Sequence, residues 1–280
     1  MTLGVAGATA LFAAAGVLVA GAVIPIAVRA APPRLVKTNI SRKLVPAVLG
    51  APLMLGAWAA LALLWGLHDS LAIPRRTGRE AAAVGMILVV VGAAGLWDDL
   101  AGRDSAHGFA GHLGALRSGR VTSGTVKMVA AVGSGLLAGL LVARGARVVE
   151  TALLVGLTAN LVNLLDRAPG RAAKVSFTVA LALVAAGSTT WSLASAGLVG
   201  ALTVCLAADL EERAMLGDAG ANALGAALGL GLAGSLGPAA RVVAVGALAA
   251  LNLASERWSF SSLIEQAPWL RALDRLGRVS

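Results

Sequence analysis

The chain has 280 residues, of which 58% are hydrophobic and 13% are charged, and its mean hydropathy is +0.84. These values exclude an ordinary soluble domain and predict a polytopic helical membrane protein. A net charge of +9 by itself would fit nucleic-acid binding. In a membrane chain it favours basic cytoplasmic loops and contact with anionic headgroups or phosphorylated substrates, so no nucleic-acid partner is expected.

Apolar runs long enough to cross a bilayer recur along the chain, and they predict an all-α transmembrane bundle of about nine spans. The first run lacks a preceding basic region and is too long for a signal peptide, so we expect it to be retained. Residues 1–255 would form the transmembrane domain, and 256–280 an interfacial amphipathic tail. The predicted spans are 3–28, 44–67, 81–97, 121–143, 148–165, 175–188, 190–208, 219–236 and 240–255.

The distribution of charge predicts the orientation of the chain. Most Lys and Arg residues fall in the tail and in the loops that nine spans would place on its side of the membrane. The positive-inside rule then puts the C-terminus in the cytoplasm and the N-terminus outside. Most acidic residues lie on the same side, and because acids contribute little to topology, they are candidates for a functional site. The loops predicted to lie in the cytoplasm together with the tail are 29–43, 98–127, 166–174 and 209–218.

Two adjacent carboxylates, Asp98 and Asp99, end the third predicted span. Ionisable groups at the edge of a membrane span are candidates for functional residues, because they are costly to keep there. A basic, glycine- and hydroxyl-rich loop from Arg117 to Lys127 follows on the same predicted side. By themselves, the acids could instead be a solvated helix end and the loop a lipid-facing basic segment.

A third feature closes the fifth predicted span. Asn160, Asn163 and Asp166 are spaced by three and therefore share one broad side of a helix, which we expect to face a polar cavity. Hydrogen bonding between helices is an alternative use of such polar groups. Arg167, Arg171 and Lys174 follow; they could bind a strongly anionic substrate or could simply replace other contacts.

A fourth feature, Gly217-Asp218-Ala219-Gly220, opens the eighth predicted span, with Asn222 close behind. Backbone N–H groups at a helix start suit phosphate oxygens. Carboxylates beside phosphates imply Mg²⁺, which prefers oxygen ligands. Together the four features predict a membrane-edge site for Mg²⁺-assisted phosphoryl chemistry, with Asp218 as the metal ligand. The charge run from Glu211 to Arg213 is interpreted as solvated.

At these residues the chain resembles the polyprenyl-phosphate N-acetylhexosamine-1-phosphate transferase family, which includes the bacterial phospho-N-acetylmuramoyl-pentapeptide transferase. The matching pieces occur in family order and cover most of the chain to about residue 255. They are Lys37-Thr38-Asn39-x-x-x-Lys43-x-x-Pro46, Gly95-x-x-Asp98-Asp99, Lys127, Asn160-x-x-Asn163-x-x-Asp166 and Met215-Leu216-Gly217-Asp218-x-Gly220.

The resemblance implies transfer of a sugar-1-phosphate from a nucleotide sugar, usually UDP-linked, to polyprenyl phosphate at the cytoplasmic face of the plasma membrane. Such reactions serve the synthesis of cell-envelope glycopolymers. By analogy, Asp218 would hold Mg²⁺, Asp98 or Asp99 would deprotonate or position the lipid phosphate, and Lys127 would contact phosphate. Asn163 and Asp166 would shape the nucleotide end, and the family also allows a homodimer. Lys37, Asn39, Asn160, Arg171, Lys174 and Asn222 complete the candidate substrate-binding set.

The chain departs from the family pattern at three places. Pro169 stands near the position of a second acid after Asp166, the segment from Ser255 to Gln266 lacks the family's histidines, and the amphipathic tail replaces the usual tenth span. These departures leave the donor base and the sugar open and do not support peptidoglycan precursor synthesis. A non-catalytic member that binds a polyprenyl-linked or nucleotide ligand is the first alternative. A transporter is a weaker one, because transporter sites lie near the bilayer midplane.

Overall fold

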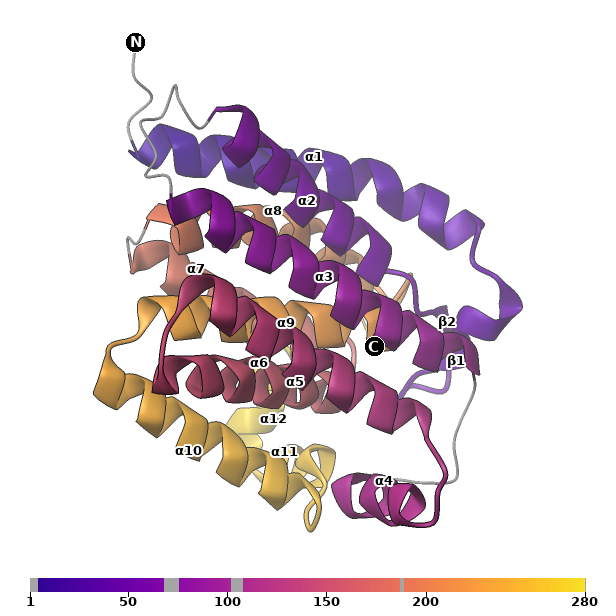
Figure 1. Cartoon of the computed structure of the whole chain (residues 1–280). Coiled ribbons are helices and arrows are strands. Elements are labelled where there is room, and N and C mark those ends of the chain that lie inside the picture. Colours follow the sequence, from indigo (N-terminus) through magenta and orange to yellow (C-terminus); the bar gives the residue numbers. More distant parts are fainter. Residues whose placement is uncertain (1–4, 68–75, 102–107, 187–188, 280) are drawn as a thin grey trace.

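The computed structural model describes residues 5–67, 76–101, 108–186 and 189–279, and 81% of it is helical. The helices pack as an all-α bundle (Figure 1). Within the described residues, six helices are long and apolar enough to cross a membrane, which identifies a multi-pass membrane protein. They are α1 (Val5–Arg29), α3 (Arg76–Ala101), α5 (Ser123–Val142), α6 (Ala146–Leu165), α8 (Thr189–Leu210) and α10 (Pro238–Ser255).

Three further helices correspond to the remaining predicted spans. They are α2 (Gly50–Gly66), α7 (Arg171–Ala185) and α9 (Gly217–Ser235). The α2 and α7 helices have only 17 and 15 residues, and α9 contains two polar residues in its first two turns, Asp218 and Asn222. A short helix, α4 (Gly108–Arg117), lies between α3 and α5. Each predicted span therefore matches a helix, although only six meet the length and apolarity of a span.

The predicted span at 44–67 begins differently from the expectation. Residues 44–46 form a strand, β2 (Leu44–Pro46), which pairs antiparallel with β1 (Val36–Thr38) after the 3-10 turn η1 (Pro33–Leu35), and Lys37 lies opposite Val45. Strand pairing satisfies the backbone groups that a helix would otherwise satisfy. We call residues 36–46 the hairpin. Met215 donates its N–H to Pro46 O at 2.9 Å, which ties the hairpin to the segment before α9.

The α9 helix lies at the centre of the bundle, packed chiefly against α6 and α3, and 15 of its 19 residues are buried. Its glycines permit this position, because a Cβ at Gly225 or Gly229 would lie 2.5 Å or 2.4 Å from a carbonyl oxygen of α6. Small residues allow membrane helices to approach closely. The sequence of α9 is therefore that of a helix surrounded by protein on nearly all sides.

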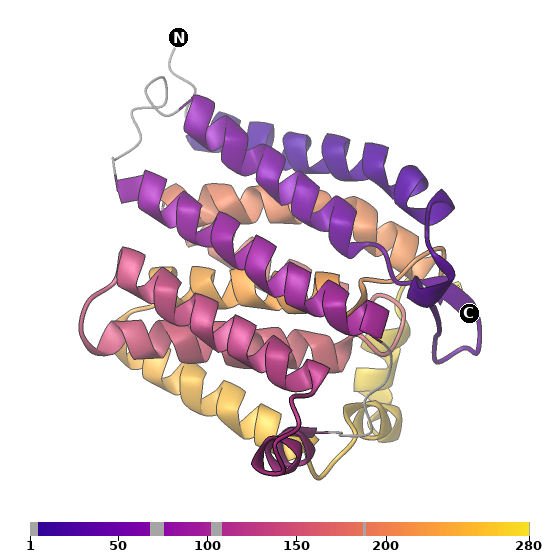
Figure 2. The same cartoon turned by 45° about the vertical axis from the view of Figure 1, so that its right-hand side comes forward.

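The hairpin lies at the end of the bundle where α3 and α6 finish and α5 and α9 begin (Figure 2). We call this the hairpin end. The tail, residues 256–280, consists of α11 (Phe260–Gln266) and α12 (Pro268–Arg275), and its contacts with the first turn of α7 place it at this same end. All four chemical features of the sequence therefore meet at one end of the bundle.

Candidate functional site

Asp99, in the last turn of α3, binds the first turn of α9. Its carboxylate oxygens accept the backbone N–H groups of Asp218 at 3.2 Å and Ala219 at 3.0 Å. The Asp99 side chain is 0% exposed and also forms an ion pair with Lys37 of the hairpin. An anion at a helix start stabilises the unpaired N–H groups there. Asp99 therefore fixes the position of Asp218 through the backbone.

Lys37 and Lys127 lie on either side of Asp218. Lys37 Nζ is 3.7 Å from Asp218 Oδ2, and Lys127 Nζ is 3.6 Å from Asp218 Oδ1. Lys127, in the second turn of α5, also forms an ion pair with Asp98. Burial lowers the pKa of Lys37, but the carboxylates of Asp218 and Asp99 outweigh that effect and raise it above the usual value of 10.5. Lys37 therefore stays charged at neutral pH.

The carboxyl groups of Asp98 and Asp218 both lie beside Lys127, whose Nζ forms the ion pair with Asp98 and is 3.6 Å from Asp218 Oδ1. Lys127 supplies a positive charge next to both carboxylates and offsets their mutual repulsion. Within the described ranges, no group of three or more His, Cys, Asp or Glu residues could hold a metal. Mg²⁺ commonly uses one or two carboxylates and completes its shell with water and phosphate oxygens, so the Asp98–Asp218 pair fits that ion.

Asp166, the residue that ends α6, is joined to the same loop. Its Oδ2 accepts the backbone N–H of Gly217 at 3.0 Å. Gly217 has φ +69° and a Cβ there would lie 2.9 Å from Ala47 Cβ, so a glycine is required for this approach. Burial, followed by the nearby charges of Asp209 and Asp218, raises the pKa of Asp166 well above 3.8. The structure thus brings all four predicted acids around residues 217–219.

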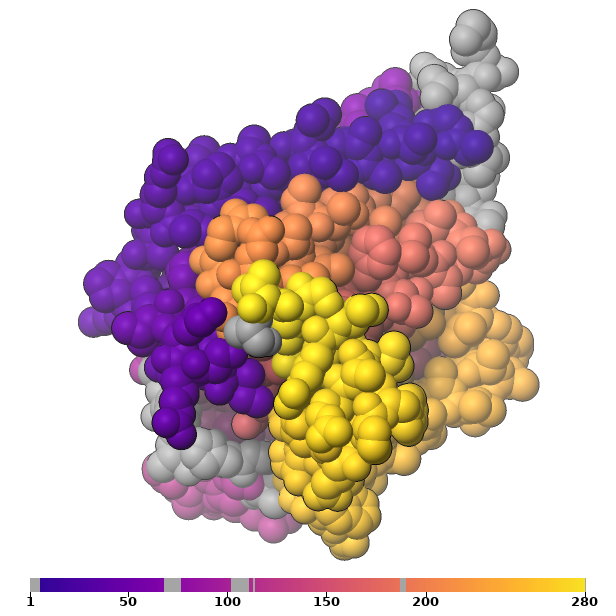
Figure 3. All heavy atoms as spheres, turned by 180° about the vertical axis from the view of Figure 1, so that it is seen from behind, coloured from indigo at the N-terminus to yellow at the C-terminus, as the bar shows by residue number. Residues whose placement is uncertain are grey.

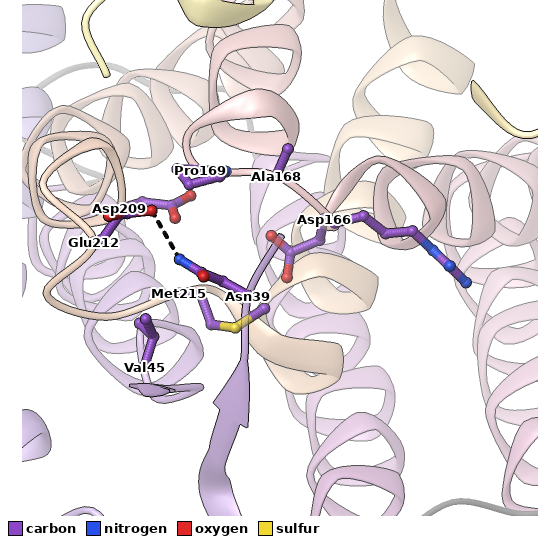
Figure 4. Close-up of a pocket in the computed structure, with 9 residues that line it drawn as sticks. Asn39, Val45, Asp166, Ala168, Pro169, Asp209, Glu212 and Met215 are labelled. Carbon is purple, nitrogen blue, oxygen red and sulfur yellow. Dashed lines mark hydrogen bonds between the residues drawn. The ribbon is translucent and has the colours of Figure 1, made fainter. Parts of the chain in front are cut away.

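A small pocket lies beside Asp166, and we call it the Asp166 pocket. Asp166 lies on one side and Asp209 and Glu212 on the other, with Asn39 of the hairpin between them (Figure 4). Asn39 Nδ2 donates to Glu212 Oε1 at 2.9 Å. Asp209, at the end of α8, is buried, and its Oδ2 has no hydrogen-bond partner among the described residues. The pocket therefore presents acceptor oxygens to whatever enters it.

The three predicted asparagines of the helices have different surroundings. Asn160 donates to Asn252 Oδ1 of α10 at 2.6 Å, and Asn252 in turn donates to Leu157 O at 3.1 Å. This is the interhelical hydrogen bonding that was the alternative interpretation of Asn160. Asn163 is half-buried one turn before Asp166. Asn222 donates to the carbonyl of Asp218 at 2.7 Å and thus supports the first turn of α9.

Arg171 and Lys174 bind the tail and are not part of the Asp218 cluster. Arg171 is buried and forms two hydrogen bonds with Asp274 of α12, at 2.7 Å and 2.9 Å. Lys174 Nζ donates to Asp274 O at 2.6 Å and to two other carbonyls at the end of α12. Arg171 and Lys174 therefore bind the tail, whereas the sequence had suggested that they bind an anionic substrate.

Three acids at the hairpin end escaped the sequence interpretation. Glu212 was taken as solvated, but its side chain is 1% exposed and pairs with Lys43. Asp209 ends an apolar run just as Asp98 does, and that position was a usable signal. Asp274 had no such signal, since its partner Arg171 lies 103 residues away.

Comparison with known proteins adds no family to these observations. No protein-family model matches the chain, and no curated protein sequence matches it.

Proposed function

We propose that this protein transfers a sugar-1-phosphate from a nucleotide sugar, in the first instance a UDP-sugar, to polyprenyl phosphate. The observation that carries the proposal is the cluster of Asp98 and Asp218 with Lys37 and Lys127, in which Lys127 lies beside both carboxylates. Two carboxylates and two cations around one helix start suit a pyrophosphate and a divalent cation together. The motif resemblance supplies the substrate class.

The proposal includes a topology. The bundle of residues 1–255 would span the membrane nine times, with the N-terminus outside and the hairpin end in the cytoplasm. Three spans would then be the shorter or less apolar helices α2, α7 and α9. The concentration of Lys and Arg in the loops at this end supports the orientation. The membrane would be the plasma membrane, where a nucleotide sugar from the cytoplasm and a polyprenyl phosphate meet.

In the proposed reaction an oxygen of the polyprenyl phosphate attacks the sugar-bearing phosphorus of the donor. A new P–O bond forms, the pyrophosphate P–O bond breaks, and a nucleoside monophosphate leaves. Lys37 and Lys127 would bind phosphate oxygens and offset their charge, and Asp98 would take the proton of a singly protonated acceptor phosphate. Bound Mg²⁺, held by Asp218 with Asp98 nearby, would supply charge stabilisation for the pyrophosphate. Asp99 would act as a positioning residue.

Transfer from a panel of labelled nucleotide sugars to undecaprenyl phosphate, with Mg²⁺, tests the proposal. We expect turnover with one donor and a loss of at least about 100-fold in Asp218→Asn and Asp98→Asn, because each loses charge at the reacting phosphates. Glu211→Gln, an exposed acid nearby, is the matched control and should retain activity. Absence of turnover across the panel would favour a non-catalytic protein that binds the same ligands. Unchanged turnover in both variants would refute the site.

A further inference from the structure

The tail helix α12 contacts the bundle through charged groups and turns its apolar side outward. Asp274 is 7% exposed, whereas Trp269, Leu273 and Leu276 are 66%, 58% and 66% exposed. These three residues are spaced by four and three, so they form one stripe along the helix. A helix on the surface of a water-soluble protein buries such a stripe and exposes its charges. The bundle itself does not cover the stripe of α12.

The inner side of α12 is held by a compact set of ion pairs. Asp274 binds Arg171 through both carboxylate oxygens, and Arg278 Nη2 lies 2.6 Å from Asp274 Oδ2. Lys174 binds the carbonyl groups at the end of the helix, where the helix dipole favours a cation. Arg171 and Asp274 are both buried, so either charge would be left without a partner if α12 moved away. The ion pair therefore holds α12 in one position.

The same attachment reaches the Asp166 pocket. Arg278 Nε donates to Pro169 O at 3.0 Å, and Pro169 lines the pocket together with Asp166. Arg171 follows Gly170 directly, at the start of α7. The tail therefore holds the loop of residues 167–170 from two points, one through the backbone of Pro169 and one through the side chain of Arg171.

The position of α12 indicates what covers its outer stripe. Its partners Arg171 and Lys174 lie in the first turn of α7, so α12 lies near the end of the bundle where α7 begins. Figure 3 shows the tail, in yellow, on the outer surface of the molecule. Only residues 256–259 separate α11 from the membrane helix α10, a connection of at most about 18 Å. Trp258 on this connection is exposed, and tryptophans favour the membrane–water interface. Arg271 and Arg275, on a third side of α12, bind Glu265 of α11 instead of the bundle, with Arg275 Nη2 3.1 Å from both carboxylate oxygens.

We propose that α12 is a lipid-anchored latch for the Asp166 pocket. Its stripe of Trp269, Leu273 and Leu276 enters the boundary between headgroups and acyl chains of the bilayer that holds α10, while Asp274 and Arg278 hold the loop 167–170. The partner of this surface is thus the lipid interface, and the latch transmits membrane attachment to the pocket. The inference does not depend on the reaction proposed above.

Fluorescence quenching tests the outer side. In a Cys205→Ala background, which removes the one native cysteine, the full chain carries either Leu273→Cys or the control Arg271→Cys, each labelled with a fluorophore. Both are reconstituted into nanodiscs with acyl-chain-brominated phosphatidylglycerol and phosphatidylcholine. We expect quenching several-fold stronger at position 273 than at position 271. Equal or absent quenching at position 273 would overturn the proposal, and disulfide crosslinking between two copies through the unlabelled position 273 would assign the stripe to a dimer.

Hydrogen exchange tests the inner side in the same nanodiscs. Asp274→Asn should raise amide exchange in residues 167–171 about tenfold, since it removes the attachment of Arg171, and Glu265→Gln, an exposed acid of the tail, should not. Arg278→Gln, which removes only the contact with Pro169 and one ion pair, is a second variant in case Asp274→Asn does not fold. Unchanged exchange in the folded variants would overturn the latch. Neither measurement requires turnover, so failure of the proposed function and failure of the latch can be distinguished.

Discussion

Asp99 accepts the backbone N–H of Asp218 at 3.2 Å, so the end of α3 is joined directly to the start of α9. Its neighbour in sequence, Asp98, pairs instead with Lys127, which also lies 3.6 Å from Asp218 Oδ1. Asp99 is 0% exposed, whereas Asp98 and Asp218 retain some access to solvent. Two adjacent carboxylates therefore have different tasks in the fold: Asp99 binds the backbone at the start of α9, and Asp98 pairs with Lys127 beside Asp218.

Asp99→Asn should destabilise the protein more than Asp98→Asn does. The first change removes the charge that binds the start of α9, which we expect to cost about 1 to 2 kcal/mol. The second change removes the ion pair of Asp98 with Lys127 but leaves Lys127 beside Asp218, so its cost should be smaller. Thermal unfolding of the purified variants in detergent measures both effects. Equal melting temperatures for the two variants would contradict the division of tasks.

Mg²⁺ should stabilise the wild-type protein through Asp98 and Asp218. A ligand at 100 times its dissociation constant stabilises the state that binds it by about 2.7 kcal/mol. We expect a rise in melting temperature with Mg²⁺ in the wild type, a much smaller rise in Asp218→Asn, and the wild-type rise in Glu211→Gln. An unchanged response in Asp218→Asn would place any bound cation elsewhere.

Asp166→Asn should stabilise the protein at neutral and alkaline pH. Burial and the charges of Asp209 and Asp218 raise the pKa of Asp166, so its charged form opposes folding. The favourable contribution of this residue is fully present below about pH 3.8 and is lost as the pH rises through the raised pKa. The difference in unfolding free energy between variant and wild type should therefore grow from acid to neutral pH. A constant difference across that range would show that the carboxylate is not perturbed.

The attachment of the tail should persist to mildly acidic pH. Burial raises the pKa of Asp274, but the hydrogen bonds and charge of Arg171, together with Arg278, outweigh burial and lower it below 3.8. Lys174 also faces this group. The stabilisation is present above the ordinary pKa and is lost as the pH falls through the lowered one. Amide exchange of residues 167–171, corrected for intrinsic rates, should be the same at pH 7 and pH 5. Loosening of that loop already at pH 5 would contradict the assignment.

Gly95→Ala should destabilise the protein by about 1 to 3 kcal/mol, because a Cβ at this position would lie 2.4 Å from Asp218 O. Gly133→Ala on α5 is the matched control, since nothing lies within 4 Å of its added Cβ. Alanine there should be neutral or stabilising, as it favours the helix. Thermal unfolding of both variants measures the difference. Similar losses in both would refute a close approach specific to Gly95.

Much of the fold follows from patterns along the chain. Apolar runs predicted the positions of nine helices, because helices in lipid must satisfy their backbone internally and must be long and apolar. The beginning of α2 was less accurate, because residues 44–46 are apolar enough for a span and yet pair with β1. Hydropathy does not distinguish a strand of three residues from the first turn of a helix.

The site was predictable where acids flank apolar runs, since Asp98 and Asp166 each end one and Asp218 precedes one. It was not predictable where a charge finds a distant partner. From the sequence, Arg171 is a candidate cation for an anionic ligand, and only the folded chain shows that Asp274 binds it. Glu212 likewise stands in a charged run, but the hairpin covers it. Such pairings depend on tertiary contacts that no local spacing encodes.

The glycine-rich centre of α9 has a consequence for how the protein enters the membrane. With Asp218 and Asn222 in its first turns, α9 does not reach the apolarity of the six membrane-spanning helices. An isolated segment of this kind partitions poorly from water into lipid. We expect α9 to be inserted only after α3 and α6 have formed the groove that receives it. Insertion of α9 would then depend on earlier assembly of these two helices, and deletion of α3 alone should leave α9 outside the bilayer.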